Sequence, residues 1–138
     1  MEIKQISVFL ENNAGRIGEV TKVLADAEIN LRAISIADTT DFGILRLIVN
    51  KHREALEALN NAGFTTRITD VVAVELEDKP GSLAKVMGLF GKTKVNIEYL
   101  YASLEGASGK AVVIFKLEDY QKGLQIIREN GLTLVESF

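Results

Sequence analysis

The hydrophobic pattern at the start of the chain changes from the period of a strand to that of a helix. Between Ile6 and Leu10 every second residue is a large aliphatic one, as in a half-buried strand. After Gly15 the apolar residues share one stripe at helical spacing, formed by Ile17, Val20, Leu24 and Ala27. A strand followed directly by a helix is therefore predicted.

Four further segments complete this pattern. In chain order they are a strand at 30–37, a polar turn at 38–41 leading to a strand at 43–49, a short helix with Leu56, Leu59 and Ala62 on one side, and a strand at 64–69. The helix ends at Gly63, a residue type that often terminates helices. The segment thus predicts a βαββαβ unit.

The whole pattern occurs twice. When the chain is shifted by 66 residues, Ile6–Asn50 lies over Val72–Lys116. Identical residues then coincide, with Val8, Leu10, Glu11, Gly15, Val20, Asn30, Gly43 and Ile48 meeting Val74, Leu76, Glu77, Gly81, Val86, Asn96, Gly109 and Ile114. Beyond this stretch the second copy is read with two extra residues, which brings Gly131 onto Gly63. Because turn glycines and strand-end polar residues are placed by backbone geometry, this match predicts a shared fold.

The second copy predicts the same six elements. They are a strand through Leu76, a helix through Leu83 and Phe90, strands at 95–104 and 109–117 around a turn at 106–109, a helix ending at Gly131, and a strand at 132–137. Two helices on one side of a four-stranded antiparallel sheet form an α+β, ferredoxin-like fold. The predicted domains are residues 1–69 and 70–138. Only Asp70 separates their adjoining strands, which excludes a flexible linker.

Several predicted strands carry apolar residues on both alternating faces. In the strand at 30–37, Leu31 and Ala33 are predicted on one face and Ile34 and Ile36 on the other. In the strand at 95–104, Ile97 and Tyr99 are predicted on one face and Leu100 and Ala102 on the other. One helical layer covers only one face of a sheet, and a unit of this size alone buries only ~60% of its unfolded surface. We therefore expect the two copies to pack together, edge to edge or stacked, and the chain to form a homodimer.

Composition and charge exclude several classes of function. The net charge is −3, whereas nucleic-acid binding needs clustered Lys and Arg. The chain has no cysteine and one histidine, which excludes thiol nucleophiles, Fe–S clusters and Cys- or multi-His-ligated metals within one chain. No apolar run approaches the ~20 residues of a membrane helix, and the N-terminus lacks the layout of a signal peptide. We expect a cytoplasmic protein with no cofactor and with neither nucleic acid nor a membrane as partner.

Two segments resemble the signature of the ACT domain. They are Leu10-Glu11-Asn12-Asn13-Ala14-Gly15-Arg16-Ile17 and Leu76-Glu77-Asp78-Lys79-Pro80-Gly81-Ser82-Leu83. In that family an acidic or amide residue, a variable residue, Pro, Gly and an apolar residue follow the first strand and precede a helix. The second strand begins with apolar-Asn-apolar, here Ile29-Asn30-Leu31 and Val95-Asn96-Ile97. The resemblance covers essentially the whole chain, twice, and implies regulation by amino acids at interfaces between paired domains.

The chain departs from the family pattern at three positions. Ala14 replaces the proline of the first motif. Glu28 and Lys94 stand where a glycine often precedes the apolar-Asn pair, so the exits of the two helices are expected to differ from the family's. The family's usual fusion to an enzyme or a transcription factor is also missing from these 138 residues.

The chemistry of a free amino acid indicates where it would bind. The helix starts at Gly15 and Gly81 offer unpaired N–H groups and a partial positive charge to its carboxylate. Asn30 and Asn96 each carry a donor and an acceptor, and Asp78 can pair with the ammonium group. If the second strands of the two copies lie side by side, each Asn faces the loop of the other copy.

Two pseudo-symmetric sites are therefore predicted, residues 12–17 with 96–101 and residues 78–83 with 30–36. The predicted ligand-binding residues are Asn12, Asn13, Ala14, Gly15, Arg16, Ile17, Asn30, Leu31, Asp78, Lys79, Pro80, Gly81, Ser82, Leu83, Asn96, Ile97 and Tyr99. Structural roles account for each of them singly, as turn, capping or strand-start residues. Tyr99 and Tyr101 favour interface packing over ligand stacking, although two tyrosines near one site lean towards an aromatic or imidazole ligand. The double occurrence of the whole set favours binding.

The sequence favours a non-catalytic sensor of a free L-amino acid over the other functions of this fold. An acylphosphatase needs a Gly-rich phosphate loop with a nearby Arg, which is not evident, and metal chaperones of this fold need a Cys pair. RNA-recognition modules need aromatic residues on a central strand and a basic face. The expected role is regulation of amino-acid metabolism, with an enzyme of that metabolism as a partner. The alternative is a ligand-free scaffold that contacts an enzyme through its sheet.

Overall fold

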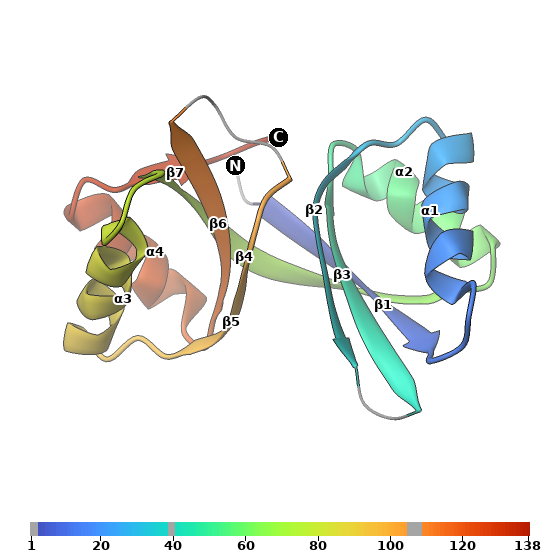
Figure 1. Ribbon diagram of the computed structural model, residues 1–138, viewed down its shortest axis with the longest axis horizontal. Coiled ribbons are helices and arrows are strands. Elements are labelled where there is room, and N and C mark those ends of the chain that lie inside the picture. The colour runs from blue at the N-terminus through green and yellow to red at the C-terminus, as the bar shows by residue number, and fades with distance from the viewer. Residues whose placement is uncertain (1–2, 39–40, 105–108) are drawn as a thin grey trace. The chain divides into compact units, whose positions relative to one another are not determined.

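The computed structural model describes residues 3–38, 41–104 and 109–138, which form the predicted α+β architecture (Figure 1). The elements are β1 (Ile3–Glu11), α1 (Arg16–Asp26), β2 (Leu31–Asp38), β3 (Phe42–Val49), α2 (His52–Asn61), β4 (Thr65–Glu77), α3 (Ser82–Lys92), β5 (Ile97–Ala102), β6 (Lys110–Leu117), α4 (Tyr120–Glu129) and β7 (Thr133–Val135). The predicted strands at 95–104 and 132–137 are thus shorter in the structure. The turn predicted at 106–109 lies, apart from Gly109, outside the described residues.

The strands of each repeat pair in the antiparallel order of a ferredoxin-like unit. In the first repeat β3 lies between β1 and β2, and in the second β6 lies between β4 and β5 while β7 pairs with β4. The complete order is β2-β3-β1-β4-β6-β5, with β7 beside β4. The predicted pair of βαββαβ units with an antiparallel sheet is confirmed.

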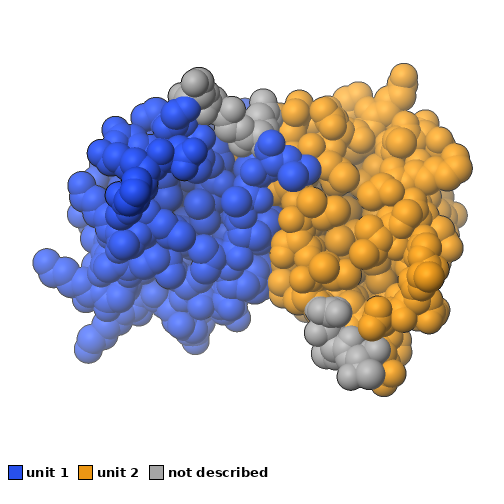
Figure 2. All heavy atoms as spheres, viewed as in Figure 1, with its two compact units in different colours: residues 1–3, 70–137 blue, residues 4–69, 138 orange. Residues whose placement is uncertain are grey.

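One strand, β4, belongs to both repeats. The chain divides into two compact units, residues 4–69 with 138 and residues 1–3 with 70–137 (Figure 2). The division falls inside the 13-residue strand β4, so Asp70 continues the strand and does not separate two strands as predicted. β-branched residues on both sides of Asp70, such as Thr69 and Val71, favour this extended backbone.

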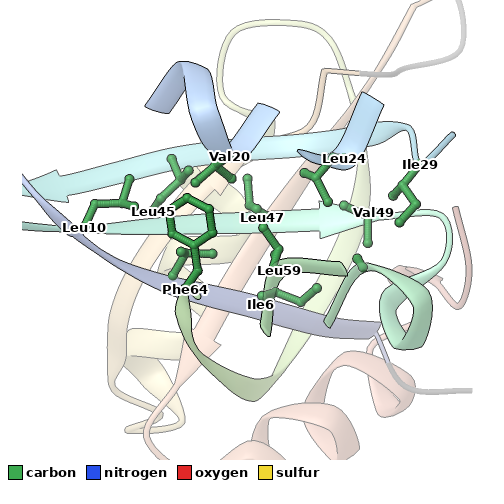
Figure 3. Packing of buried hydrophobic residues seen from close by; sticks show 12 residues of the cluster. Ile6, Leu10, Val20, Leu24, Ile29, Leu45, Leu47, Val49, Leu59 and Phe64 are labelled. Carbon is green, nitrogen blue, oxygen red and sulfur yellow. The ribbon is translucent and has the colours of Figure 1, made fainter. Parts of the chain in front are cut away.

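The first unit folds around a core that its two helices build on one face of the strands. Val20 and Leu24 of α1 and Leu59 of α2 lie against strand residues such as Leu45 and Leu47 (Figure 3). All five side chains are at most 1% exposed. The complete cluster is Ile6, Val8, Leu10, Val20, Leu24, Ile29, Leu45, Leu47, Val49, Ala55, Leu59 and Phe64.

The second unit repeats this core with larger side chains on its helices. Phe90 of α3 takes the position of Leu24 and meets Phe115 of β6 edge-to-face, with ring centroids 5.6 Å apart. Leu124 and Ile127 of α4 close the other side. Burial of an aromatic pair of this kind makes a large contribution to stability, because it removes much apolar surface from water.

The strand register places the two extra residues of the second repeat earlier than predicted. Ile6 opposes Leu47 in the first repeat, whereas Val72 opposes Phe115 in the second. Matching residues of β1 and β4, and of β2 and β5, therefore differ by 66 in number, whereas matching residues of β3 and β6 differ by 68. The two extra residues thus lie between β5 and β6. The predicted matches of Gly43 with Gly109 and of Ile48 with Ile114 are wrong. Surface connections between strands accept insertions at little cost, and strict identity matching across the connection missed this one.

A bulge near the start of each second strand changes which residues share a face. The register shifts between Leu31 and Ala33 and again between Ile97 and Tyr99. Leu31 and Ile34 consequently pack on the same helix-side core, and the opposite face of β2 carries Ala33, Ser35 and Ala37. The predictions that Leu31 shares a face with Ala33, and Ile97 with Tyr99, are both wrong, because a bulge interrupts the regular alternation. The strand β2 therefore gives little support to the predicted homodimer, whereas Tyr99 and Tyr101 do share the face away from the helices.

The two exits from the first helix of each repeat have the same backbone despite lacking glycine. Glu28 has a φ of 58° and Lys94 a φ of 59°. The next residue in each case bonds back to the helix, from Ile29 N–H to the Leu24 carbonyl and from Val95 N–H to that of Phe90, both at 2.9 Å. Both exits thus take a left-handed backbone conformation that glycine adopts without strain, although neither residue is a glycine.

We expect Lys94→Gly to raise the free energy of unfolding by about 0.5–1 kcal/mol, because it relieves the left-handed strain at the helix exit. Urea denaturation measures this change. Ala84→Gly, at an exposed position in the first turn of α3, is the matched control and should lower stability by up to about 1 kcal/mol. A loss of stability in Lys94→Gly would show that the lysine side chain contributes more than the strain costs.

Candidate functional site

The two predicted glycine turns have the same backbone conformation. Gly15 has φ 88° and ψ −12°, and Gly81 has φ 90° and ψ −13°. Each is the N-cap residue of the helix that follows, and only glycine adopts this left-handed conformation without a steric penalty. A Cβ built on either glycine would meet no atom within 4 Å, so the space in front of each turn is open.

Four backbone hydrogen bonds hold each turn, and they correspond one to one. In the first repeat they run from Asn12 to Asp41 (2.9 Å), Asn13 to Glu11 (2.8 Å), Arg16 to Asn13 (3.4 Å) and Glu19 to Gly15 (3.0 Å), each from N–H to carbonyl. In the second they run from Asp78 to Gly109 (2.9 Å), Lys79 to Glu77 (2.9 Å), Ser82 to Lys79 (3.3 Å) and Lys85 to Gly81 (3.0 Å). Ala14 therefore supports the same turn as Pro80.

The helices that follow these turns begin without a side-chain cap. No side chain at Gly15 or Gly81 can accept a hydrogen bond from the first helical turn, whereas Asp119 caps α4 by accepting from the Lys122 N–H at 3.1 Å. The amide groups early in α1 and α3 have no carbonyl four residues earlier within the helix. Together with the helix dipole, they favour a negatively charged group in the open space at each turn.

The side chains around the first turn are largely tied to one another. The Arg16 guanidinium lies 4.8 Å from the centre of the Phe64 ring and forms an ion pair with Glu19. The Asn13 side chain donates a hydrogen bond to the Glu11 carboxylate at 3.3 Å. Arg16 is therefore partly packed against the protein and is not a freely solvated surface residue. Ile17, which follows it, is 42% exposed beside the turn.

The second turn carries different charges. Lys79 and Glu77 form an exposed ion pair at 2.7 Å. The pKa of Glu77 is lowered, first by the hydrogen bond from Lys79 and then by the positive charges of Lys79, Lys110 and Lys85, and the pKa of Lys79 is raised by the same hydrogen bond. The Asp78 side chain makes no hydrogen bond or ion pair with the residues that the structure describes. It is therefore available to an ammonium group.

Asn30 and Asn96 lie at the other end of their repeats from the glycine turns. Each repeat places an 11-residue helix between them, α1 or α3, which is about 16 Å long. The Asn30 carbonyl accepts from the Asn50 N–H at 3.2 Å, and the Asn96 carbonyl accepts from the Glu118 N–H at 3.0 Å. Neither repeat brings its own Asn to its own glycine turn.

The surroundings of Asn96 contain functional candidates that sequence reasoning missed. Asn96 lines an open depression of about 710 Å³ together with Lys94, Glu118, Asp119 and Tyr120. A positive side chain, Lys94, and two negative ones, Glu118 and Asp119, thus line the same depression, as a zwitterionic ligand requires. The misplaced insertion concealed them, because it aligned Lys116 and not Glu118 with Asn50.

The remaining predicted site residues divide between core and surface. Leu31 and Ile97 pack on the helix-side cores, and Leu83 is 38% exposed next to the second turn. Tyr99 is half-buried on the opposite face of β5, where it lies across from Lys116. The second strands themselves, β2 and β5, stand at the two ends of the strand order. They are not hydrogen-bonded to each other within the described chain.

The described residues contain neither a metal-ligating cluster nor a membrane-spanning helix. Within residues 3–38, 41–104 and 109–138, no three His, Asp or Glu side chains gather as a metal site would require. In the described part of the chain, no helix is long and apolar enough to cross a membrane.

Comparison with known proteins identifies the family. A family profile described as an ACT domain pair matches residues 1–137. No curated protein matches the chain. A crystal structure of protein BT0572 from Bacteroides thetaiotaomicron is 41% identical, with a TM-score of 0.92, and the match covers 98% of this chain and 92% of that one.

Two structures of lower identity share the fold. The ligand-free regulatory subunit of aspartate kinase from Thermus thermophilus is 21% identical, with a TM-score of 0.68 over 93% of this chain and 91% of that one. The corresponding subunit from Thermus flavus is 20% identical, with a TM-score of 0.63 over 94% and 92%. The family profile spans both repeats and nearly every residue. The chain belongs to the family of ACT domain pairs.

Proposed function

We propose that this ACT domain pair is a non-catalytic sensor that binds a free L-amino acid and regulates amino-acid metabolism. The observation that carries the proposal is the duplicated turn at Gly15 and Gly81, with the same φ and ψ, the same four backbone hydrogen bonds and no side-chain cap. The same open space and the same uncapped helix start therefore occur at both turns. Family membership supports the same role.

In the proposed site the amino acid bridges two repeats. Its carboxylate accepts hydrogen bonds from the amides of Leu83 and Ala84, the two in the first turn of α3 that do not bond within the turn, and its ammonium group pairs with Asp78. The amide of an Asn from another repeat completes the shell, with Asn30 serving the second turn and Asn96 the first. A ligand that contacts two repeats at once binds one arrangement of them more tightly than others, and this difference in affinity is what a regulatory signal requires.

A second copy of the chain is the proposed source of the other repeat. β2 and β5 each have a hydrogen-bonded neighbour on one side only, β3 and β6 respectively, among the described strands. Unpaired strand edges are templates for pairing with another chain. A homodimer that pairs these edges would place the second strands side by side, as the predicted sites require.

A thermal-shift screen with the twenty amino acids, followed by calorimetry, tests the sensor. We expect at least one amino acid to raise the melting temperature, because a ligand at 100 times its Kd stabilises the folded state by about 2.7 kcal/mol. Light scattering of the same samples reports whether the binding species is a dimer. A flat response to all twenty amino acids would leave the scaffold as the better interpretation.

The scaffold, which contacts a partner enzyme through its sheet, is favoured by one observation. Phe9 and Phe42 lie on the sheet face away from the helices and are 43% and 63% exposed. Exposed aromatic side chains are common at protein–protein contacts. Phe9→Ser with Phe42→Ser should leave amino-acid binding intact and weaken only a contact made through the sheet.

A further inference from the structure

Glycines inside the helices of the second repeat fall into two kinds. Gly123 of α4 is required by internal packing, because a Cβ there would lie 2.1 Å from Leu117 Cδ1. Gly88 and Gly91 of α3 have no such reason, since a Cβ at either would meet nothing within 4 Å. Both are exposed, and glycine in a helix interior weakens the helix relative to alanine. Nothing within the described chain accounts for their small size.

An apolar groove lies along this side of α3. It has a volume of about 280 Å³ and runs between α3 and the segment that follows α4. Its floor is formed by Val86, Leu89 and Leu132, its centre is left open by Gly88, and its rim carries Lys85 and Lys92. The missing side chain at position 88 lets another molecule approach the backbone of α3 closely.

The charged residues that line the groove are all positive. α3 contains two lysines and no acidic residue, although the whole chain has a net charge of −3. The side chains of Lys85 and Lys92 make no hydrogen bond or ion pair with the described residues, although the charge of Lys85 helps to lower the pKa of Glu77. Two uncompensated cations therefore flank an apolar floor.

The first repeat supplies an internal comparison. The positions that match Lys85 and Lys92 are Glu19 and Asp26 of α1, and each is neutralised on its own helix, by Arg16 and by Lys22. Lys22 also occupies the position of Gly88. The matching positions of α1 therefore carry a lysine and paired charges, whereas α3 carries a glycine and two unpaired lysines, so the charge and the open backbone of the groove are not requirements of the fold.

We propose that the groove of α3 docks an amphipathic helix of a partner protein that carries acidic residues on its flanks. Lys85 and Lys92 are seven residues apart, which is two helical turns or about 10 Å, so they match carboxylates spaced two turns apart on a docked helix. An apolar side chain of that helix lies over Gly88, between the two ion pairs. The inference goes beyond amino-acid sensing and assigns partner contact to the helices of the second repeat.

A synthetic helix tests the proposal. The probe is a short peptide with leucines along one side and glutamates two turns apart on the flank, and the control peptide has lysines in place of the glutamates. Titration into ¹⁵N-labelled full chain, followed by NMR, should shift the amide signals of Gly88, Leu89, Lys92 and Leu132 with the acidic peptide alone. No amino acid is present, so failure here leaves the proposed sensor untouched.

Variants sharpen the test. Lys85→Glu with Lys92→Glu should weaken the acidic peptide by roughly tenfold or more and make the lysine peptide the better ligand, because the charge complementarity is reversed. Gly88→Leu should block the acidic peptide while the protein remains folded, as its NMR spectrum and melting curve will show. Lys22→Leu, the matched substitution on α1, should leave binding unchanged.

Three results would overturn the proposal. The first is equal binding of the acidic and basic peptides, and the second is signal changes that spread over α1 as well as α3. The third is absence of acidic-peptide binding at millimolar concentration. If octanoate shifts the same amides while the acidic peptide does not, the groove is a site for a small amphipathic anion and the docked helix is wrong.

Discussion

Gly81→Val abolishes amino-acid binding at the second turn and leaves the protein folded, if the ligand carboxylate meets the backbone there. The Cβ that the substitution adds meets no atom beyond its chain neighbours within 4 Å, so the new side chain extends into the open space that the ligand needs. The stability loss of about 1–3 kcal/mol comes from holding valine at a φ of 90°. Calorimetry and melting curves measure the two effects separately.

A matched control separates loss of the site from backbone strain. Gly131 also has a positive φ, 65°, and open space around its Cβ position, but it follows α4 and belongs to neither glycine turn. Gly131→Val should therefore cost a similar amount of stability and leave binding unchanged. Full-strength binding at both sites in Gly81→Val would show that the pocket lies elsewhere.

The partner Asn gives the complementary result. Asn96→Ala should weaken the site at the first turn and spare the site at Gly81, because Asn96 is proposed to serve the Gly15 turn of another repeat. If Asn96 has only a structural role, the substitution changes the melting temperature and leaves both affinities as they are.

Phe90→Ala should lower the free energy of unfolding by about 3–5 kcal/mol, because it removes a fully buried ring and leaves a cavity against Phe115. This is a large share of the ~5–15 kcal/mol that stabilises an ordinary domain. Leu24→Ala, at the matching position of α1, should cost about 2–5 kcal/mol. Urea denaturation of both variants measures these losses.

The two substitutions also report on the independence of the repeats. Leu24 and Phe90 belong to separate cores, so their effects should add within about 0.5 kcal/mol in the double variant if both cores unfold in one transition. A loss below 1 kcal/mol for Phe90→Ala would contradict the packing described for the second core.

The repeat, the elements and the fold class were predictable from the sequence because each rests on local periodicity. The helical stripe of Val20 and Leu24 and the alternation of Ile6, Val8 and Leu10 appear unchanged in the structure. The bulges in β2 and β5 were not predictable in this way. A bulge moves every later residue to the opposite face, and nothing in the residue types at 31–33 distinguishes it from regular alternation.

The glycine turns around which the site is proposed were predictable from the sequence, and the depression beside Asn96 was not. A glycine between a strand and a helix indicates a turn, and the structure places both Gly15 and Gly81 in a left-handed N-cap conformation. The residues beside Asn96 come from the start of α4, and their position depends on an insertion in a connection. Sequence matching has little power there, because loops have few residues that geometry constrains.

The shared strand β4 has a consequence for how this protein can change in evolution and in the laboratory. Val72, Val74 and Leu76 face a core, while Ala73 and Glu75 alternate with them. One residue inserted after Asp70 would leave the strand continuous. It would turn Val72, Val74 and Leu76 to the opposite face of the sheet relative to the first half of the strand. Most tandem domains tolerate length changes at their junction. Here the junction lies inside a strand, so only insertions of an even number of residues keep the side chains of both halves on their faces. Expressing residues 1–69 or 70–138 alone would likewise leave a cut strand with an exposed edge, a template for aggregation.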